Sequence, residues 1–472
     1  MDAGSTRQLS RRQLLRWSAL GLAGITGASL LAACGGSAAD TPAAAGGGAA
    51  NASTVASGAP KSSAPAQIRW QFRGQDVDIK GGQAALDTFF KASNPNISVT
   101  IEAAPDDQRD EKLVAAMVAG TAPDVFESWT DNVTQFADRG QVLDVEPLVK
   151  RDLKDDDIKD FHAWQWHDFV LPSGIRFGLP KYVNVMTLWS NKDLFEKAGQ
   201  ALPTKDWTHK EYADAARKLS KVTGSPTDVY GARIPIWSWD RFWYQVEMFG
   251  GKVVNPSDTT ECLLGTPEAL AGLEWARELL WDSKALANPL SLGTLTANPI
   301  PQYAAQRFAM AEDGFYPFRM MREINGAFKL QYAPVPKGPV ARKVLGTTDG
   351  YVISSKSKNQ DAAWELLKFL SGKDYQIAQA GWSGLLPVRA SALDGWKQTV
   401  LKAYPDLEAA NIDVGPDAMK EGYPGNRILF KKDAEARQII QPALEKVFTS
   451  GNTPVSYFKE IADQVTKGQR AG

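Results

Sequence analysis

The sequence contains few of the side chains that hold metals or serve in nucleophilic catalysis. Among 472 residues there are 2 Cys and 3 His, and His162, His167 and His209 do not have metal-binding spacing. The G-x-S-x-G, P-loop and G-x-G-x-x-G motifs do not occur either. Lys and Arg total 53 against 54 for Asp and Glu, which leaves no basic excess to bind nucleic acid. We therefore expect no enzyme, metal site, cofactor or nucleic-acid partner.

The first 33 residues have the layout of an export signal. Four arginines precede an apolar, glycine-containing run over 17–33, which is shorter than the roughly 20 residues that span a bilayer. We therefore expect a signal peptide and not a transmembrane helix. The segment Ser10-Arg11-Arg12-Gln13-Leu14-Leu15-Arg16 resembles the twin-arginine consensus, and Leu31-Ala32-Ala33-Cys34-Gly35 resembles a bacterial lipobox.

The lipobox predicts that Cys34 becomes the lipidated first residue of the mature chain. Residues 34–66 are then a flexible linker, because 36–66 consists almost entirely of Gly, Ala, Ser, Thr and Pro and buries too little apolar surface to fold. We expect acyl chains on Cys34 to hold the protein at the outer face of the cytoplasmic membrane. Cys262 has no disulfide partner in this arrangement and is expected to be a buried apolar side chain.

The folded part begins with alternating strands and helices. Residues 68–72 and 97–101 alternate like strands around a helical stretch at about 82–91. A helix over 113–120, with Gly120 as its C-cap, precedes a further short strand that begins at Val125. This order predicts α/β layers and a largely parallel sheet.

Helix starts are well marked further along the chain. Asn191 is expected to cap a helix that ends at Gly199, and Thr208 with Glu211 forms the pattern of a capping box. Thr266 precedes a proline at the first helical position of another helix. An apolar stripe over 363–370 predicts a helix that Gly372 closes.

These elements, in this order, resemble the family 1 extracellular solute-binding proteins, the sugar-binding components of ABC importers that include the maltose-binding proteins. The likeness runs from about residue 68 to the C-terminus. Its anchors are Phe89 through Asn94-Pro95-Asn96-Ile97-Ser98-Val99, Met117 through Val125, Gly178-Leu179-Pro180, Asn191 through Phe195, Ala333 through Gly338, Gly346 through Ile353, and Ala362 through Leu370.

The resemblance implies an α/β, two-lobed periplasmic-binding-protein fold of type II-like topology, with a hinge and a ligand cleft between the lobes. It places the N-terminal lobe at 67–181 and 350–390 and the C-terminal lobe at 182–349 and 391–472. The family often has Tyr before the Asn of its Tyr-Asn-Lys motif, whereas this chain has Trp189-Ser190-Asn191. That departure weakens any transfer of ligand identity.

A sugar presents C–H groups on its ring face and hydroxyls at its edge, so a receptor needs aromatic platforms and hydrogen-bonding side chains. Trp129 and Asp131 follow a strand, and open α/β sheets bind ligands beyond the carboxyl ends of their strands. Residues 236–243 hold three tryptophans that either face the cleft or pack in the core. The resemblance adds Tyr316 and Asp349. The further candidate ligand-binding residues are Arg73, Gln75, Asp76, Asn184, Trp237, Trp239, Asp240 and Trp382.

The sequence thus predicts an exported, monomeric carbohydrate-binding lipoprotein that delivers its ligand to the permease subunits of an ABC transporter and their ATPase. A glycan-acting enzyme would also use aromatic and carboxylate side chains, but the absent motifs argue against it. A polyol, a peptide or a phosphorylated polyol remains open as the ligand. A ligand-sensing receptor that signals without transport also remains open, because it needs the same closing lobes.

Overall fold

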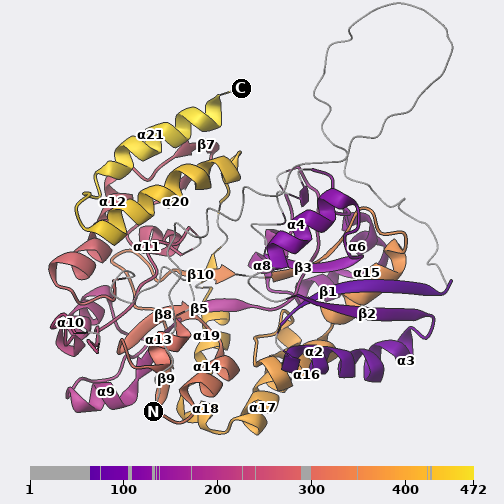
Figure 1. Cartoon of the computed structure of the whole chain (residues 1–472), viewed down its shortest axis with the longest axis horizontal. Coiled ribbons are helices and arrows are strands. Elements are labelled where there is room, and N and C mark those ends of the chain that lie inside the picture. The colour runs from indigo at the N-terminus through magenta and orange to yellow at the C-terminus, as the bar shows by residue number, and fades with distance from the viewer. Residues whose placement is uncertain are drawn as a thin grey trace, which may run out of the picture. The chain divides into compact units, whose positions relative to one another are not determined.

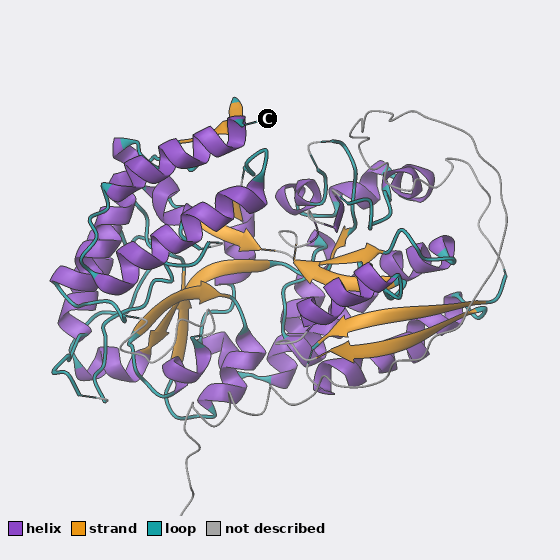
Figure 2. Cartoon of the chain, turned by 45° about the horizontal axis from the view of Figure 1, so that its top comes forward, coloured by secondary structure: helices purple, strands orange, loops and turns teal. Residues whose placement is uncertain are grey.

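The computed structural model describes residues 64–74, 76–104, 109–129, 133, 136–137, 139–171, 173–225, 227–239, 241–288, 299–347, 349–422, 424–425 and 428–471. The export signal, Cys34 and the linker up to residue 63 lie outside these residues. Within them, strands gather into two five-stranded sheets and one two-stranded ribbon, with helices packed around the sheets (Figures 1 and 2). No helix in the described ranges is both long and apolar enough to cross a bilayer.

The first sheet has the strand order β2-β1-β3-β11-β4. β1 pairs in parallel with β2 and β3, whereas β11 is antiparallel to both β3 and β4. The alternation expected at 68–72 is real, because Ile68, Trp70 and Phe72 are buried on one face of β1. The strands are β1 (Ala66–Arg73), β2 (Ile97–Ala104), β3 (Val125–Trp129), β4 (Leu179–Pro180) and β11 (Asp349–Ile353).

Helices cover both faces of the first sheet. In Figure 1, α2 and α3 lie below the strands and α4 and α6 lie above them. The helix expected at 82–91 is longer than predicted, because α2 continues through a π-helical segment at Leu86–Phe90 into α3. The helices are α2 (Asp76–Ala85), α3 (Lys91–Ser93), α4 (Arg109–Ala119), α6 (Glu146–Asp152), α7 (Asp155–Lys159), α8 (Ala163–Asp168), α15 (Gln360–Leu370) and α16 (Lys373–Ser383).

The second sheet is organised around β5. All eight residues of β5 are buried, and it pairs with β8, β9 and β10, each in the antiparallel sense. β12 extends the sheet in parallel beside β10, and β6 with β7 forms the separate ribbon. The strands are β5 (Asn184–Asn191), β6 (Val254–Asn255), β7 (Asp258–Cys262), β8 (Met310–Gly314), β9 (Leu330–Ala333), β10 (Val344–Thr347) and β12 (Pro424–Gly425).

The helices around the second sheet come from the middle and the end of the chain, and α12 continues as a π-helical segment at Glu278–Asp282. They are α9 (Lys192–Lys197), α10 (His209–Leu219), α11 (Trp243–Met248), α12 (Pro267–Arg277), α13 (Ile300–Ala304), α14 (Pro317–Ile324), α17 (Leu393–Ala403), which follows a 3-10 turn at Ala390–Ala392, α18 (Asp406–Ala409), α19 (Val414–Lys420), α20 (Asp433–Ser450) and α21 (Tyr457–Arg470).

The prediction of a largely parallel sheet was wrong. The first sheet is mixed and the second is mainly antiparallel. The reason is the chain path, because the chain leaves the first sheet after β4 and re-enters it only at β11, which runs opposite to β3. Strand direction here depends on pairings between residues more than two hundred positions apart, such as Gly350 with Ser128. The alternation of apolar and polar residues within one strand does not indicate the direction of its partner.

Local signals for helix ends were more reliable. Asn191 accepts a hydrogen bond from the N–H of Leu194, and Thr208 forms the capping box with Glu211. Thr266 accepts from the N–H of Ala269 ahead of α12. Gly372 differs from its prediction: α15 already ends at Leu370, and Gly372 has φ −81° and is the N-cap of α16. Cys262 is buried, as expected, and burial raises the pKa of its thiol to about 12.

Two adjacent carboxylates, Glu312 and Asp313, are buried in β8. Asp313 forms ion pairs with the guanidinium groups of Arg233 and Arg241, so its charge is compensated. Glu312 instead accepts hydrogen bonds from the Tyr244 hydroxyl and the Gln245 amide at 2.6 and 2.8 Å. Burial outweighs these bonds and raises the pKa of Glu312 to about 7.

The raised pKa of Glu312 makes the free energy of unfolding depend on pH. Because the folded-state pKa lies above the unfolded value, protonated Glu312 stabilises the fold below about pH 4.5, and this contribution is lost as pH rises through 7. In Glu312→Gln this titration is absent. We expect the variant to gain stability relative to the wild type between about pH 5 and pH 8, by up to about 3 kcal/mol. Urea denaturation over this pH range measures the difference.

The control for this prediction is Glu274→Gln, which alters a half-exposed glutamate of α12. Its stability curve should run parallel to that of the wild type. The interpretation of Glu312 is wrong if Glu312→Gln also runs parallel to the wild type.

Candidate functional site

A pocket of about 160 Å³ lies where the chain passes between the two sheets. Residues 181–183 connect β4 of the first sheet to β5 of the second, and β11 of the first sheet begins at Asp349, directly beyond β10 of the second. Both connections contribute to the wall. The lining residues are Phe72, Gly74, Asp78, Lys181, Tyr182, Tyr316, Arg319, Arg322, Asp349, Gln379, Trp382, Ser383 and Leu385.

The first sheet contributes the carboxyl end of β1. Phe72 is the last of the inward-facing residues of that strand, so its ring reaches the pocket at the edge where α/β sheets usually bind ligands. Gly74 follows it and leaves room for the ring, because a Cβ there would lie 2.8 Å from Phe72 and 2.6 Å from the Cβ of Asp78. The end of β1 therefore contributes an apolar part of the pocket wall, next to the carboxylate of Asp78 from α2.

Trp382 is a partly exposed aromatic side chain in the wall, and it depends on a glycine of another helix. Its ring packs so closely on α2 that a Cβ on Gly81 would lie 2.3 Å from it. Tyr375 lies two helical turns earlier in α16, and the two rings meet edge-on at a centroid distance of 6.1 Å. These contacts fix the orientation of the indole before any ligand arrives, which lowers the entropy cost of stacking.

Tyr316 is held from the second sheet. Its hydroxyl accepts a hydrogen bond from the side-chain NH2 group of Asn184 at 2.6 Å. The side-chain oxygen Oδ1 of Asn184 accepts a hydrogen bond from the backbone N–H of Phe315 at 3.0 Å. Asn184 is only 4% exposed and does not line the pocket. The structure therefore uses Asn184 to position Tyr316 at the pocket wall.

Lys181 lies on the connection between the sheets and carries a buried ion pair. Its ammonium group is 2.5 Å from a carboxylate oxygen of Glu127 in β3, and both side chains are at most 5% exposed. The Lys181 N–H also donates to the carbonyl of Asp349 at 2.8 Å. Removing one partner of such a pair would leave an uncompensated buried charge, which typically costs 3–5 kcal/mol. The two connections are thereby tied to each other and to β3.

The structure places the predicted site residues in different surroundings. Tyr316, Asp349 and Trp382 line the pocket together. Asp76 begins α2 and is exposed outside the pocket lining, and Arg73 and Trp129 end β1 and β3. Gln75, Asp131 and Asp240 lie outside the described residues.

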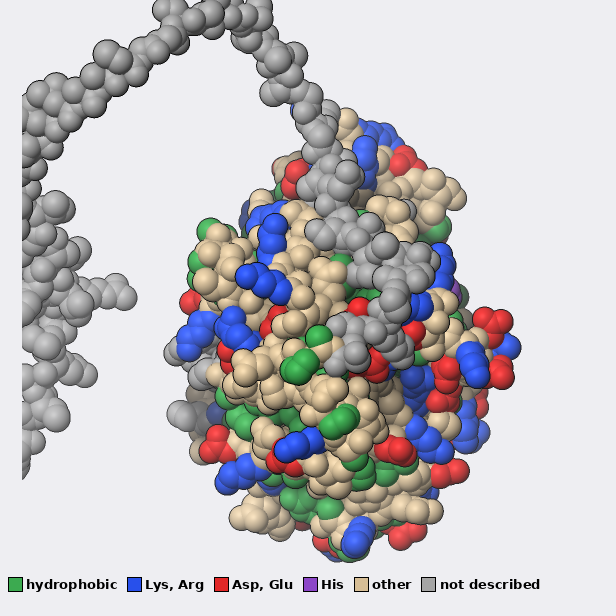
Figure 3. All heavy atoms as spheres, turned by 90° about the vertical axis from the view of Figure 1, so that its right-hand side faces the viewer, with side chains coloured by type: hydrophobic (Ala, Val, Ile, Leu, Met, Phe, Trp, Pro, Cys, Tyr) green, Lys and Arg blue, Asp and Glu red, His purple; other side chains and the backbone are tan. Residues whose placement is uncertain are grey.

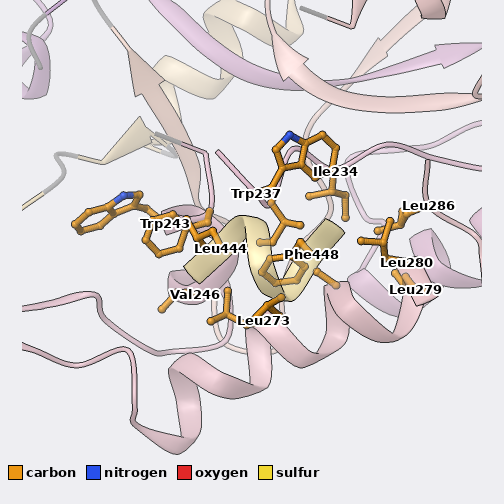
Figure 4. Close-up of a cluster of buried hydrophobic side chains, with 14 of the residues drawn as sticks. Ile234, Trp237, Trp243, Val246, Leu273, Leu279, Leu280, Leu286, Leu444 and Phe448 are labelled. Atoms are coloured by element: carbon orange, nitrogen blue, oxygen red, sulfur yellow. The ribbon is translucent and has the colours of Figure 1, made fainter. Parts of the chain in front are cut away.

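Trp237 and Trp239 lie in the core of the second sheet's helices. Both are at most 3% exposed, and Figure 4 shows Trp237 beside Ile234 in a cluster of buried side chains. This placement corresponds to the core-packing alternative for residues 236–243. The Arg233 guanidinium lies 5.4 Å from the Trp237 ring centroid. The neighbours of the Trp237 ring are therefore this cation and the apolar cluster.

Sequence reasoning missed several pocket residues: Phe72, Asp78, Lys181, Tyr182, Arg319, Arg322 and Gln379. One signal was present for two of them. Pro317 marks a first helical position directly after Tyr316, so Arg319 and Arg322 fall on one side of the helix that follows the predicted aromatic residue. In the described part of the chain, no group of three or more His, Cys, Asp or Glu side chains is placed to hold a metal ion.

Comparison with known proteins identifies the family. The model of the bacterial extracellular solute-binding proteins matches residues 77–377, which is more than half of the chain. The chain belongs to this family. It is a solute-binding protein of the ABC importer type, and proteins of this type deliver their ligands to transporter permeases. The family and its structural neighbours are not enzymes, as the sequence predicted.

Individual relatives of this solute-binding protein are distant. A candidate binding protein of Brucella abortus is 28% identical over 310 residues, which are 63% of this chain and 70% of that protein. An uncharacterized lipoprotein of Streptomyces antibioticus is 23% identical over 413 residues, 84% of this chain and 85% of that one.

The fold is shared with an ABC substrate-binding protein of Listeria monocytogenes solved with cycloalternan. The TM-score is 0.73 at 23% identity, over 85% of this chain and 98% of that chain. The solute-binding protein thus has the two-lobed α/β fold of periplasmic binding proteins, which confirms the predicted fold class.

The packing of Trp382 on Gly81 gives a testable consequence. In Gly81→Ala the new methyl group would overlap the indole, so Trp382 or α2 must move. We expect the free energy of unfolding to fall by about 1–3 kcal/mol, measured by urea denaturation.

A matched control is Gly381→Ala in α16, next to Trp382. Its Cβ would meet nothing closer than the Thr399 methyl group at 3.5 Å, an ordinary contact. Alanine at a helical position should stabilise the protein by about 0.5–1 kcal/mol. Equal stability of the two variants would contradict the packing argument.

Proposed function

We propose that this protein captures a carbohydrate outside the cytoplasm and delivers it to an ABC importer through closure of its two lobes. The observation that carries this proposal is the pocket at the connections between the sheets, where Tyr316 and Trp382 come together with polar side chains. A ligand held there contacts both lobes. Binding therefore favours the closed conformation, in which both lobes contact the ligand. The protein alters no bond of the ligand.

The chemistry of the lining residues suits a ring with hydroxyl groups. The partly exposed rings of Tyr316 and Trp382 offer surfaces for the C–H face of a sugar, and the Gln379 amide and the Asp349 carboxylate offer partners for its hydroxyls. Each stacking contact contributes about 1–2 kcal/mol. Two such contacts together with paired hydroxyls reach the roughly 8 kcal/mol of micromolar binding.

The lobe boundaries that we propose are 67–181 with 350–390 for the first lobe and 182–349 with 391–472 for the second. Sheet membership supports them, because β1 to β4 and β11 form one sheet and β5, β8, β9, β10 and β12 form the other. The hinge then consists of residues 181–183 and the junction of β10 with β11.

We further propose that the protein is exported by the twin-arginine route and stays at the outer face of the membrane as a lipid-anchored monomer. The support is the lipobox around Cys34, the extracellular character of the family and a relative that is called a lipoprotein. The face in Figure 3 interleaves acidic and basic side chains, so it offers no single-sign patch for binding nucleic acid.

Ligand binding is tested by a thermal-shift screen over mono- and oligosaccharides, followed by calorimetry with each hit. A ligand at 100 times its dissociation constant should add about 2.7 kcal/mol to the folded state. Trp382→Ala should weaken binding of the hit about tenfold or more, because a stacking surface is lost.

Phe89→Ala is the control for Trp382→Ala, since it removes a 45% exposed ring of the same lobe that does not line the pocket. It should bind like the wild type. The proposal falls if only peptides shift the unfolding temperature, or if both variants bind a sugar equally well.

The lipid anchor is tested separately with Cys34→Ser. We expect this variant to leave the detergent phase in Triton X-114 partitioning while its ligand affinity stays unchanged, because acyl chains supply the membrane affinity. Cys262→Ala is the matched control and should remain in the detergent phase. Partitioning of Cys34→Ser into detergent would refute the anchor.

A further inference from the structure

Two arginines of the second lobe line the pocket without a counter-charge. Arg319 and Arg322 lie three residues apart on α14, so both face the same wall. In the described part of the chain, neither forms an ion pair or a side-chain hydrogen bond, and the Nε atom of Arg319 is buried with no acceptor. A desolvated guanidinium N–H without an acceptor costs free energy until something accepts its hydrogen bond.

The buried cations of this protein contrast with Arg319, which is partly buried and has a buried Nε atom without an acceptor, and with Arg322, which is exposed. Lys181 is paired with Glu127, Arg233 and Arg241 with Asp313, Arg176 with Glu146, and Arg389 with Asp160. The Arg389 contact is 3.9 Å long, and the others are 3.2 Å or shorter. Arginine and lysine are seldom buried unless they are paired, and the fold follows this rule away from the pocket.

The acidic side chains of the pocket do not neutralise the two arginines. Asp78 also lines it from α2 of the first lobe, and Asp349 lines it from the junction of β10 with β11, but each has an interaction of its own. The charge of Lys181 is compensated by Glu127. Partly buried Arg319 and exposed Arg322 are therefore the cations of the pocket that no described acidic side chain pairs with.

We propose that the ligand is an anionic carbohydrate, whose carboxylate or phosphate binds between Arg319 and Arg322 while its ring contacts Trp382 and Tyr316. The inference rests on the proposed carbohydrate-binding function and narrows its ligand class. A guanidinium group presents parallel N–H donors that match the oxygens of a carboxylate or a phosphate. The Gln379 side chain in the same lining can bind a hydroxyl of the same ligand.

A competing role for the arginines is lobe closure alone. Asp78 belongs to the opposite lobe, so closure would bring it toward α14 whatever the charge of the ligand. In that case, removal of the arginines would weaken neutral and anionic ligands equally. The ratio of the two affinities therefore separates the two roles, whereas a single affinity does not.

The experiment measures dissociation constants by calorimetry for the purified full-length protein. The probes are glucose as the neutral reference, glucuronate and galacturonate for the carboxylate, and glucose 1-phosphate and glycerol 3-phosphate for the phosphate. We expect at least one anionic probe to bind about tenfold or more tighter than glucose at low salt. This preference should shrink as ionic strength rises.

Arg319→Gln/Arg322→Gln should lose the preference for the anionic probe by about tenfold or more, and Arg319→Lys/Arg322→Lys should retain part of it. The control Arg217→Gln/Arg437→Gln removes two charges from α10 and α20, outside the pocket lining, and should keep the preference. Comparison of the uronates with the phosphates then identifies which anion the site receives.

Three outcomes would overturn the inference. Binding of glucose as tight as that of every anionic probe, or an equal loss for both classes in the Gln double variant, removes the anionic ligand but leaves the carbohydrate-binding function intact. Failure of every carbohydrate probe, with a peptide bound instead, removes both.

Discussion

The short connections between the two sheets are the constraint on which the site depends. Residues 181–183 and the junction of β10 with β11 are the places where the chain moves from one sheet to the other, and the Lys181–Glu127 ion pair fixes the first of them to β3. A buried ion pair is favourable only with close geometry. It therefore holds the backbone of the connection in one position, and the pocket walls contributed by α2, α14 and α16 are arranged around that point.

The sequence predicted the features that neighbouring residues decide. Caps such as Asn191 and Thr208 depend on contacts within one helical turn, and both were found where the pattern placed them. The burial of Trp237 could not be predicted, because a tryptophan-rich segment has the same composition whether it faces a core or a cleft. The direction of β11 could not be predicted either, since it is set by pairing with a strand more than two hundred residues earlier.

The lining of the candidate pocket was predicted only in part, and for a physical reason. Tyr316, Asp349 and Trp382 were candidates because aromatic and carboxylate side chains near turns and crossings suit a sugar. Arg319 was not a candidate, because a charged residue in a short helix is usually solvated. Only the positions of its neighbours show that its Nε atom is buried without an acceptor. Asn184 was a candidate ligand contact, and its amide instead holds Tyr316.

The walls of the pocket and the centre of the second sheet are built from different residues. β5 is buried along its whole length and contributes none of the lining side chains, which come from helix ends, strand ends and connections. Substitutions that change the shape or charge of the pocket thus leave the most heavily paired strand of the protein untouched. This separation makes the chain a suitable scaffold for directed evolution toward new ligands, because recognition can diverge while foldability is preserved.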